Sequence, residues 1–201
     1  MTDTFGLLLG PVIIDGTTQP GFSGKPIIEL KGTGPNPEFF DGLAIHGPGS
    51  VITGLVINEF SQDGIQLLSD GNHVFGNYIG TDATGTSAAG NGRAGIFIID
   101  VSNNVIGGPP NIESERNVIS GNGRFGIDLS GGVAGKDNII SGNLIGTDIT
   151  GTIDLGNGLD GVHIHSGKDN TVENNLISGN DLNGIRFHGE DTFDNRIIGN
   201  F

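Results

Sequence analysis

A short phrase recurs six times along the chain: glycine, an apolar residue, a variable residue and a second apolar residue. Gly161-Val-His-Ile164 is one copy. Successive copies are 22 or 23 residues apart at the two ends of the series and 31 to 35 residues apart in its middle. The alternation predicts short β-strands, and the recurrence predicts a repeat architecture. The copies begin at Gly42, Gly64, Gly95, Gly126, Gly161 and Gly184.

The stretch from Gly161 to Asn183 contains one complete repeat. Its apolar alternation at 162–164, 171–173 and 176–178 predicts three strands of about three residues, separated by corners rich in glycine and asparagine. Strands this short do not suit a β-sandwich, whose strands run to about five or six residues. A coil of three short strands instead buries its apolar side chains by stacking on the next coil.

The repeat register predicts two columns of inward-pointing apolar residues on the first strand, because side chains along a strand alternate in direction. With the insertions removed, the chain forms about seven coils of roughly 22 residues. One column contains Leu43, Ile65, Ile96, Ile127, Val162 and Ile185. The other contains Ile45, Leu67, Ile98, Leu129, Ile164 and Phe187.

Asparagine marks the corners in register. It tolerates left-handed backbone conformations, and identical asparagines on stacked coils can form a hydrogen-bonded ladder. We expect one column at Asn72, Asn103, Asn138, Asn170 and Asn195. We expect a second, structural ladder at Asn77, Asn117, Asn143, Asn175 and Asn200.

Longer motifs follow the same register. They are Val12–Gly21, Ile79–Thr86 (Ile-Gly-Thr-Asp-Ala-Thr-Gly-Thr), and the pair Asn117–Asn122 and Asn175–Asn180, both of which read Asn, apolar, Ile, Ser, Gly, Asn. Through these motifs the chain resembles the right-handed parallel β-helix proteins of the pectin-lyase-like superfamily, in particular the repeat segments of large bacterial surface or secreted proteins. The resemblance implies an all-β fold, a right-handed parallel β-helix or β-solenoid. It implies no activity, because these motifs build corners and core.

Three insertions interrupt the coils, at Thr81–Asn91, Gly107–Arg116 and Thr147–Asn157. Residues 77–98 and 143–164 are identical at 13 of 22 aligned positions, so the first and third insertions are near copies at the same corner. We expect these two loops to lie beside each other. They either cover exposed coil surface or form a binding face, since inserts in repeat proteins gather on one face.

The two ends of the chain differ in regularity. Residues 1–40 predict an irregular first coil with a cap, and residues 41–201 predict regular coils within the same single domain. No capping pattern precedes Phe201. Because an uncapped coil exposes unpaired strand edges, we expect self-association by end stacking, or a place within a larger protein.

The composition of the chain excludes several classes of partner and chemistry. Nine basic and 23 acidic residues give a net charge of −14, which excludes nucleic acid as the expected partner. The chain has no cysteine, so thiol catalysis and cysteine-ligated metals are excluded. No apolar run approaches the length of a membrane span, and the first ten residues lack the basic start of a signal peptide.

Polar side chains with chemical potential gather on the outward positions of the first strand near the C-terminal end. One outward column contains Asp128, His163 and Arg186, and its neighbour contains His165 and His188. Three interpretations stay open for this cluster: a solvated polar face, a site that binds or acts on an acidic sugar, and a transition-metal site. As catalytic candidates we single out Asp128, His163 and Arg186, and as ligand-binding candidates all five.

Several observations weigh against catalysis. The two outward columns contain a single acid, Asp128, whereas glycoside hydrolysis usually uses a pair of carboxylates. The Asp-Pro-His motif of alginate epimerases is absent, and so is the Gly-x-Ser-x-Gly turn that would support a Ser130–His165–Asp128 triad. Asp41 and Asp63 precede repeat glycines, where an Asp-Gly turn is expected and a calcium site is the alternative. We otherwise expect no cofactor and no metal.

An apolar section adjoins this polar cluster. Leu68, Phe97 and Ile99 occupy outward positions on neighbouring coils. A contiguous apolar patch is usually covered, so either a duplicated loop or a partner is expected on it. These residues are therefore candidates for self-association through a lateral face.

Together these features predict a structural or binding β-solenoid, a segment of a larger surface or secreted protein that presents a ladder face to a glycan or a protein. The alternative is a polysaccharide lyase, hydrolase or epimerase that acts on acidic glycans through Asp128, His163 and Arg186. The expected location of the parent protein is extracellular or at the cell surface.

Overall fold

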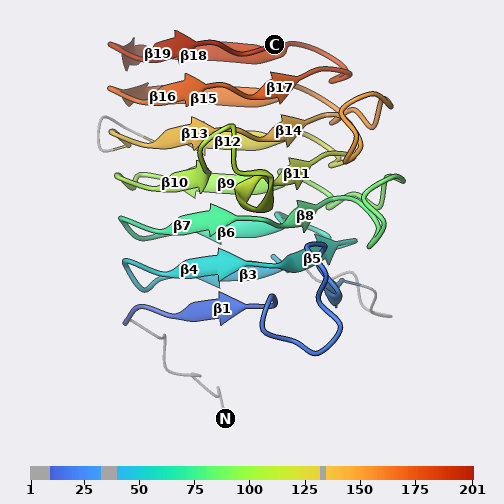
Figure 1. Cartoon of the computed structure of the whole chain (residues 1–201). Helices are drawn as coiled ribbons and strands as arrows, with labels where there is room; N and C mark the ends of the chain where they lie inside the picture. The colour runs from blue at the N-terminus through green and yellow to red at the C-terminus, as the bar shows by residue number, and fades with distance from the viewer. Residues whose placement is uncertain (1–9, 33–39, 132–134) are drawn as a thin grey trace.

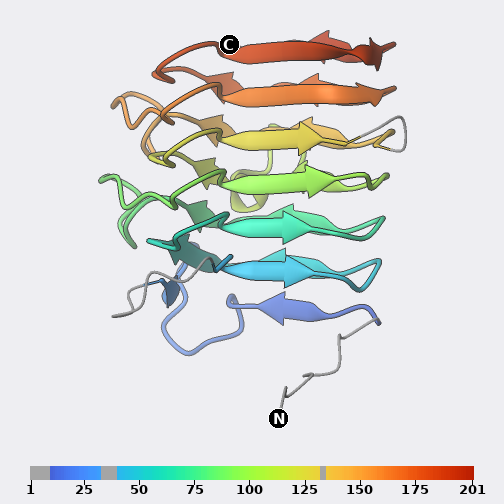
Figure 2. The ribbon, with the colours of Figure 1, turned by 180° about the vertical axis from the view of Figure 1, so that it is seen from behind.

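The computed structural model describes residues 10–32, 40–131 and 135–201. Among these residues the regular elements are β-strands and one 3-10 turn, η1 (Glu113–Glu115). The strands form three parallel sheets, and the chain visits the sheets in turn, so that each full coil adds one strand to each of them. Figures 1 and 2 show the coils stacked from the N-terminal to the C-terminal end.

The three sheets, here named A, B and C, are each built from every third strand. Sheet A contains β1 (Ile13–Asp15), β4 (Val51–Thr53), β7 (His73–Phe75), β10 (Val105–Gly107), β13 (Ile139–Ser141), β16 (Thr171–Glu173) and β19 (Arg196–Ile198). Sheet B contains β2 (Ile28–Lys31), β5 (Leu55–Asn58), β8 (Tyr78–Ile79), β11 (Val118–Ile119), β14 (Leu144–Ile145) and β17 (Leu176–Ile177). Sheet C contains β3 (Leu43–Ile45), β6 (Ile65–Leu67), β9 (Ile96–Ile99), β12 (Ile127–Ser130), β15 (Val162–Lys168) and β18 (Ile185–Phe193).

The predicted register of sheet C is confirmed. Ile127 pairs with Ile96 on one side and with Val162 on the other, and all pairs are parallel. These three side chains are fully buried, as is Ile164, whereas Phe187 on the last coil is 42% exposed. The apolar columns therefore form the core of a parallel β-helix, and the last coil leaves part of that core open.

Three asparagine ladders, one at each corner of the coil, tie successive coils together. In each ladder the backbone N–H and the side-chain amide of one asparagine donate to Oδ1 of the next, at 2.8 to 3.4 Å. The corner from sheet A to sheet B has the predicted ladder at Asn77, Asn117, Asn143, Asn175 and Asn200. The corner from sheet B to sheet C has a ladder that the sequence analysis missed, at Asn91, Asn122, Asn157 and Asn180.

The third ladder, at the corner from sheet C to sheet A, corrects one prediction. Its second member is Asn104, which donates to Asn138, and not Asn103. Asn103 is exposed and takes a left-handed conformation with φ 60°. The residue before the ladder asparagine has a positive φ in the other coils too, where it is glycine or aspartate, so two adjacent asparagines obscured the register. The ladder residues are Asn72, Asn104, Asn138, Asn170 and Asn195.

Two strands of sheet C are longer than the predicted three residues. β15 has seven residues and β18 has nine, and their pairing shifts register between His165 and Gly167. Ser166 has a positive φ of 60° there. The strands continue past this bulge to Lys168 and Phe193, where the repeat pattern predicted a corner between strands at 162–164 and 171–173.

The two duplicated loops lie beside each other, as expected. The backbone N–H of Ile149 donates to the carbonyl oxygen of Gly85 at 2.9 Å. Each loop is a small hairpin closed by an aspartate, because Asp82 and Asp148 each accept from two backbone N–H groups and a threonine hydroxyl of their own loop. Figure 1 shows both loops projecting from the same side of the stack.

These loops pack onto the outer face of sheet B. A second apolar cluster, distinct from the interior core, is buried there, and Ile149 of the third insertion packs against it. The interpretation of the loops as covers for coil surface is therefore supported for sheet B. The cluster consists of Val56, Tyr78, Val118 and Leu144.

The N-terminal strands belong to the stack. β1 pairs with β4, β2 with β5 and β3 with β6, so these three strands belong to the first coil. The predicted cap over residues 1–10 lies outside the described residues except for Gly10. No helix in the described part of the chain is long and apolar enough to cross a membrane.

Candidate functional site

The sheet C register brings the predicted polar residues together. Asp128 pairs with His163, and His163 pairs with Arg186 on the next coil. Two residues further along each strand, His165 pairs with His188. Because paired side chains on one face of a sheet are direct neighbours, these five residues form a continuous patch, here called the histidine patch.

A hydrogen-bonded group forms the buried base of this patch. His163 Nδ1 lies 3.0 Å from Asp128 Oδ1, and the Ser130 hydroxyl donates to the same oxygen at 2.6 Å. Asp128 is 8% exposed and His163 is 9% exposed. A carboxylate only accepts hydrogen bonds, so Nδ1 carries the proton and the imidazole is fixed in orientation. The serine bonds to the aspartate and not to a histidine, which rules out the Ser130–His165–Asp128 relay.

Four rings form a cluster above sheet C. Phe125 stacks on His163 with ring centroids 4.6 Å apart and an interplanar angle of 13°. His165 and His188 stack on each other at 4.8 Å, and His163 lies 5.9 Å from His165. Both His165 and His188 are exposed. Phe125 precedes the repeat glycine Gly126, and we had not singled it out because an isolated aromatic residue at a corner carries no sequence signal.

Arg186 is held by an aspartate that the sequence analysis missed. Arg186 Nη1 lies 3.9 Å from Oδ2 of Asp160, whose side chain is completely buried. Asp160 Oδ1 accepts from the backbone and side-chain nitrogens of Asn183, while Oδ2 has no hydrogen bond. A buried carboxylate oxygen rarely lacks a partner, so the half-exposed guanidinium is its available counter-charge. Asp-Gly at this corner was the only signal in the sequence.

The same arrangement recurs toward the N-terminal end of the sheet. Arg93 Nη1 lies 4.0 Å from Asp63 Oδ2, another buried oxygen without a hydrogen bond. Burial raises the pKa of Asp63, although the hydrogen bond from the Ala94 N–H and the charge of Arg93 lower it in part. Asp41 Oδ1 accepts from the Asp63 N–H at 3.0 Å. These hydrogen bonds are those of an Asp-Gly turn, which is the structure expected for Asp41 and Asp63.

The apolar section next to the histidine patch is only partly covered. Leu68, Phe97 and Ile99 are half-buried on neighbouring coils. Phe97 pairs with Asp128, and the Arg93 guanidinium lies 5.9 Å from the Phe97 ring centroid. The duplicated loops pack on sheet B and leave this section uncovered. The Arg93 guanidinium is the group that lies over the Phe97 ring.

Within the described ranges no three His, Asp or Glu side chains are arranged to hold a metal ion. The three imidazoles of the histidine patch lie with ring centroids 4.8 to 6.3 Å apart and interplanar angles of 9° to 27°. Direct coordination needs ligand atoms that converge at about 2.0 to 2.6 Å from one ion.

Comparisons with known proteins support the fold. No protein-family model and no curated protein matches the chain. The chain is similar to a crystal structure described as the periplasmic alginate epimerase AlgG, with a TM-score of 0.58 and 13% sequence identity. The chain is a right-handed parallel β-helix. The similarity covers 86% of this chain and 44% of that one, so the chain spans less than half the length of the known structure.

Proposed function

We propose that this right-handed parallel β-helix binds an acidic polysaccharide on the outer face of sheet C. Arg186, His165 and His188 are the contact residues, because their side chains are exposed. Asp128 and His163 are the buried support beneath the cluster of rings. The binding solenoid is a segment of a larger surface or secreted protein, a location in keeping with a fold neighbour that is described as periplasmic.

The observation that carries this proposal is the cluster of three imidazoles on sheet C beside an arginine. An arginine fork pairs with a carboxylate through two parallel hydrogen bonds, and imidazole edges supply further donors and acceptors. Adjacent coils repeat every 4.7 to 4.9 Å or so, so the patch presents these groups at regular steps along the axis. A polymer that repeats an acidic unit is the ligand class suited to such an array.

Charge supports the same ligand class. The chain as a whole carries a net charge of −14, which repels polyanions. The histidine patch is less acidic than the chain as a whole, because the charge of Arg186 offsets that of Asp128 and its other three members are histidines. An acidic ligand therefore meets less repulsion on this part of the surface.

A polysaccharide lyase or epimerase is the second candidate, favoured by the hydrogen bond between Asp128 and His163. An imidazole oriented by a carboxylate can act as a base at its other nitrogen. It would take the proton from the carbon next to a uronate carboxylate, while Arg186 pairs with that carboxylate. Delivery of a proton from water to the opposite face gives the epimer, and departure of the neighbouring glycosidic oxygen, protonated by water, gives an unsaturated sugar. This candidate ranks second because His163 is 9% exposed and Phe125 stacks on one face of its ring.

Binding is tested by calorimetric titration with polygalacturonate and with polymannuronate. Arg186→Ala should weaken binding about tenfold or more, since a hydrogen bond to a charged partner contributes about 1.5–3 kcal/mol and 1.4 kcal/mol is a factor of ten. Arg196→Ala is the matched control, because Arg196 is an exposed arginine of the same end of the stack but lies on sheet A. Equal affinity in all three proteins, or no binding to either polymer, contradicts the proposal.

Turnover separates the two candidates. The protein is incubated with the same polymers in heavy water and assayed for unsaturated product, new reducing ends and deuterium at the carbon next to the carboxylate. Binding without any of these changes supports the binding solenoid. Deuterium uptake that disappears in His163→Gln supports the epimerase.

Self-association through the ends of the stack or through Leu68, Phe97 and Ile99 stays a prediction. The partly exposed apolar side chains on sheet C and on the last coil are the features that support it. The mass in solution tests it: a dimer that Phe97→Lys converts to a monomer supports a lateral interface, and a concentration-independent monomer contradicts both forms.

A further inference from the structure

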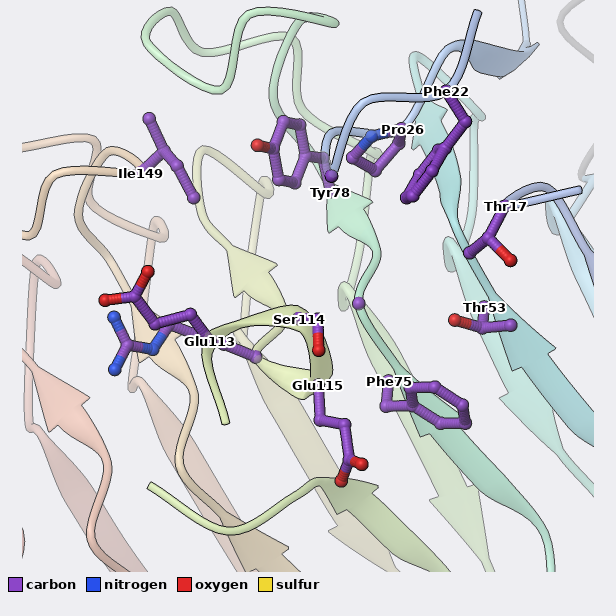
Figure 3. Close-up of a pocket in the computed structure, with 13 residues that line it drawn as sticks. Thr17, Phe22, Pro26, Thr53, Phe75, Tyr78, Glu113, Ser114, Glu115 and Ile149 are labelled. Atoms are coloured by element: carbon purple, nitrogen blue, oxygen red, sulfur yellow. The ribbon is translucent and has the colours of Figure 1, made fainter. Parts of the chain in front are cut away.

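The insertions form a hollow on the outer surface of the corner from sheet A to sheet B. It lies away from the histidine patch on sheet C. It lies between η1 of the second insertion, the turn that follows β1, and Ile149 of the third insertion (Figure 3). Two adjoining cavities of about 330 and 610 Å³ share Tyr78, Ser114 and Arg116 among their lining residues. Binding sites for small molecules usually measure about 300–1,000 Å³.

The hollow has an apolar wall. Tyr78 belongs to the loop-covered cluster on sheet B, is 3% exposed, and forms the buried floor of the hollow between Ile149 and Pro26 in Figure 3. The half-buried rings of Phe22 and Phe75 form the accessible part of the wall. Aromatic rings offer large apolar faces at a fixed position, which is how a binding site receives the C–H face of a ligand.

The backbone holds this wall and the second insertion in contact. The Gly76 N–H donates to the Glu115 carbonyl oxygen at 3.3 Å, and a Cβ on Gly76 would lie 2.6 Å from the carbonyl oxygen of Ser114. Gly76 has a φ of 65°, which L side chains rarely adopt. The close approach of η1 to the corner before Tyr78 therefore depends on glycine, and the hollow is built into the fold.

The polar groups of the hollow have no partners within the described part of the chain. Lys25, Arg116, Glu113 and Glu115 form no ion pair there, and the hydroxyls of Tyr78, Thr53 and Ser114 form no hydrogen bond. Two positive and two negative side chains cancel, so the hollow has no preference for an anion or a cation. It offers unpaired donors and acceptors beside an apolar wall.

We propose that this hollow binds a neutral carbohydrate, one or two sugar units in length. A sugar ring combines an apolar C–H face with a rim of hydroxyl groups, each both donor and acceptor. The aromatic wall suits the first, and the uncommitted charged and hydroxyl groups suit the second. This site does not depend on the function proposed for sheet C, because it uses other residues on other sheets and selects an uncharged ligand.

The protein contains its own probe for this site. Tyr78 is the one tyrosine of the sequence, which has no tryptophan, so the tyrosine fluorescence of the whole chain reports on the hollow alone. Titration with maltose, cellobiose, lactose and mannobiose should produce a saturable change in this fluorescence with at least one sugar. If none of the four changes the signal, and a calorimetric titration with them gives no heat, the proposal is overturned.

Matched variants locate the effect. Arg116→Ala should raise the dissociation constant for the bound disaccharide about tenfold, by loss of hydrogen bonds from a charged group. Arg124→Ala, at an exposed arginine outside the lining of the hollow, should leave it unchanged. Glu113→Gln provides a milder second variant on exposed η1, where loss of the fold is not expected. Equal dissociation constants in all four proteins would place the sugar elsewhere and contradict the assignment.

Discussion

The outer faces of sheets B and C rest on the same coils but differ in how they are covered. On sheet B, Val118 and Leu144 point outward and are nevertheless buried, because the duplicated loops pack over them. On sheet C, Leu68 and Phe97 at outward positions are only half-buried. The interior beneath both faces is the same stack of apolar columns. In this solenoid the insertions, and not the coil residues, decide which face meets solvent.

This difference gives each face its own chemistry. The open face of sheet C exposes a strand surface, on which register alone brings Asp128, His163 and Arg186 together. The covered face of sheet B has an apolar floor, and loops from three parts of the chain enclose a hollow above it. We accordingly expect a long ligand on sheet C and a short one at the hollow.

The largest expected effect comes from the corner that joins the two faces. Asn157, fully buried in the ladder between sheets B and C, accepts from Asn122 and donates to Asn180 and to the carbonyl of Ile119. Asn157→Ala leaves several buried groups unpaired and should lower the free energy of unfolding by about 4 kcal/mol, at 1–3 kcal/mol per group. Chemical denaturation measures this, with Asn111→Ala on an exposed insertion as the control. A loss below about 1 kcal/mol would mean that the ladder contributes little.

A pair of leucine substitutions compares the two faces directly. Leu144→Ala should cost about 3 kcal/mol, within the range for buried leucines, because the loops have made its outward position part of a core. Leu68→Ala should cost about 1 kcal/mol, since the side chain is only half-buried. Both values come from denaturant titrations of the variants. Equal losses would contradict the view that the loops, and not the coil, bury the outer face of sheet B.

Acid should loosen the covering loops before the coils. Burial raises the pKa of Asp148, but the hydrogen bonds from Ile153, Thr150 and Thr152 more than compensate, and the net pKa lies below its ordinary value of 3.8. The carboxylate is therefore favoured in the folded state, and its stabilisation is present above pH 3.8 and lost as the pH falls through the lowered value.

The corresponding measurement compares the wild-type chain with Asp148→Asn. The wild-type protein should be more stable by about 1 kcal/mol at neutral pH, and this difference should shrink as the pH falls below about 4. Asp137→Asn, at an exposed aspartate beside sheet A, should give no such pH dependence. A difference that persists in acid would show that the carboxylate is not what closes the loop.

The smallest effect concerns Tyr78 under the loops. Burial raises its pKa above the ordinary value of 10.0, so the folded state favours the neutral phenol. The resulting stability is present below about pH 10 and is lost as the pH rises through the raised value, because only the unfolded chain ionises readily. Phenolate absorbance reports this residue alone. Ionisation at the ordinary value in the folded protein would mean that the loops do not cover the ring.

The fold and the sheet C patch could be predicted because both follow from register. Apolar alternation after the repeat glycine determines which residues point inward, and the repeat length determines which residues become vertical neighbours. The same register makes Asp128, His163 and Arg186 neighbours on successive coils. The predicted asparagine column is wrong at one coil. Asn103 takes the left-handed conformation there, and Asn104 is the ladder residue.

The remaining features depend on contacts between segments that no period relates. Asp160 was not predicted, because its place beside Arg186 depends on a contact with the next coil. The hollow around Tyr78 requires the turn after β1, η1 and Ile149 to meet, and insertions have no register that predicts such a meeting. The insertions could be located in the sequence, but the sheet that they cover could not be identified.

One comparison of affinities tests the central claim that the two faces bind different ligands. The wild-type chain, Arg186→Ala and Arg116→Ala are each titrated with polygalacturonate and with the neutral disaccharide that binds best. We predict that Arg186→Ala loses about tenfold for the polymer alone, and that Arg116→Ala loses about tenfold for the disaccharide alone. Variants that weaken both ligands together, or neither, would contradict the account.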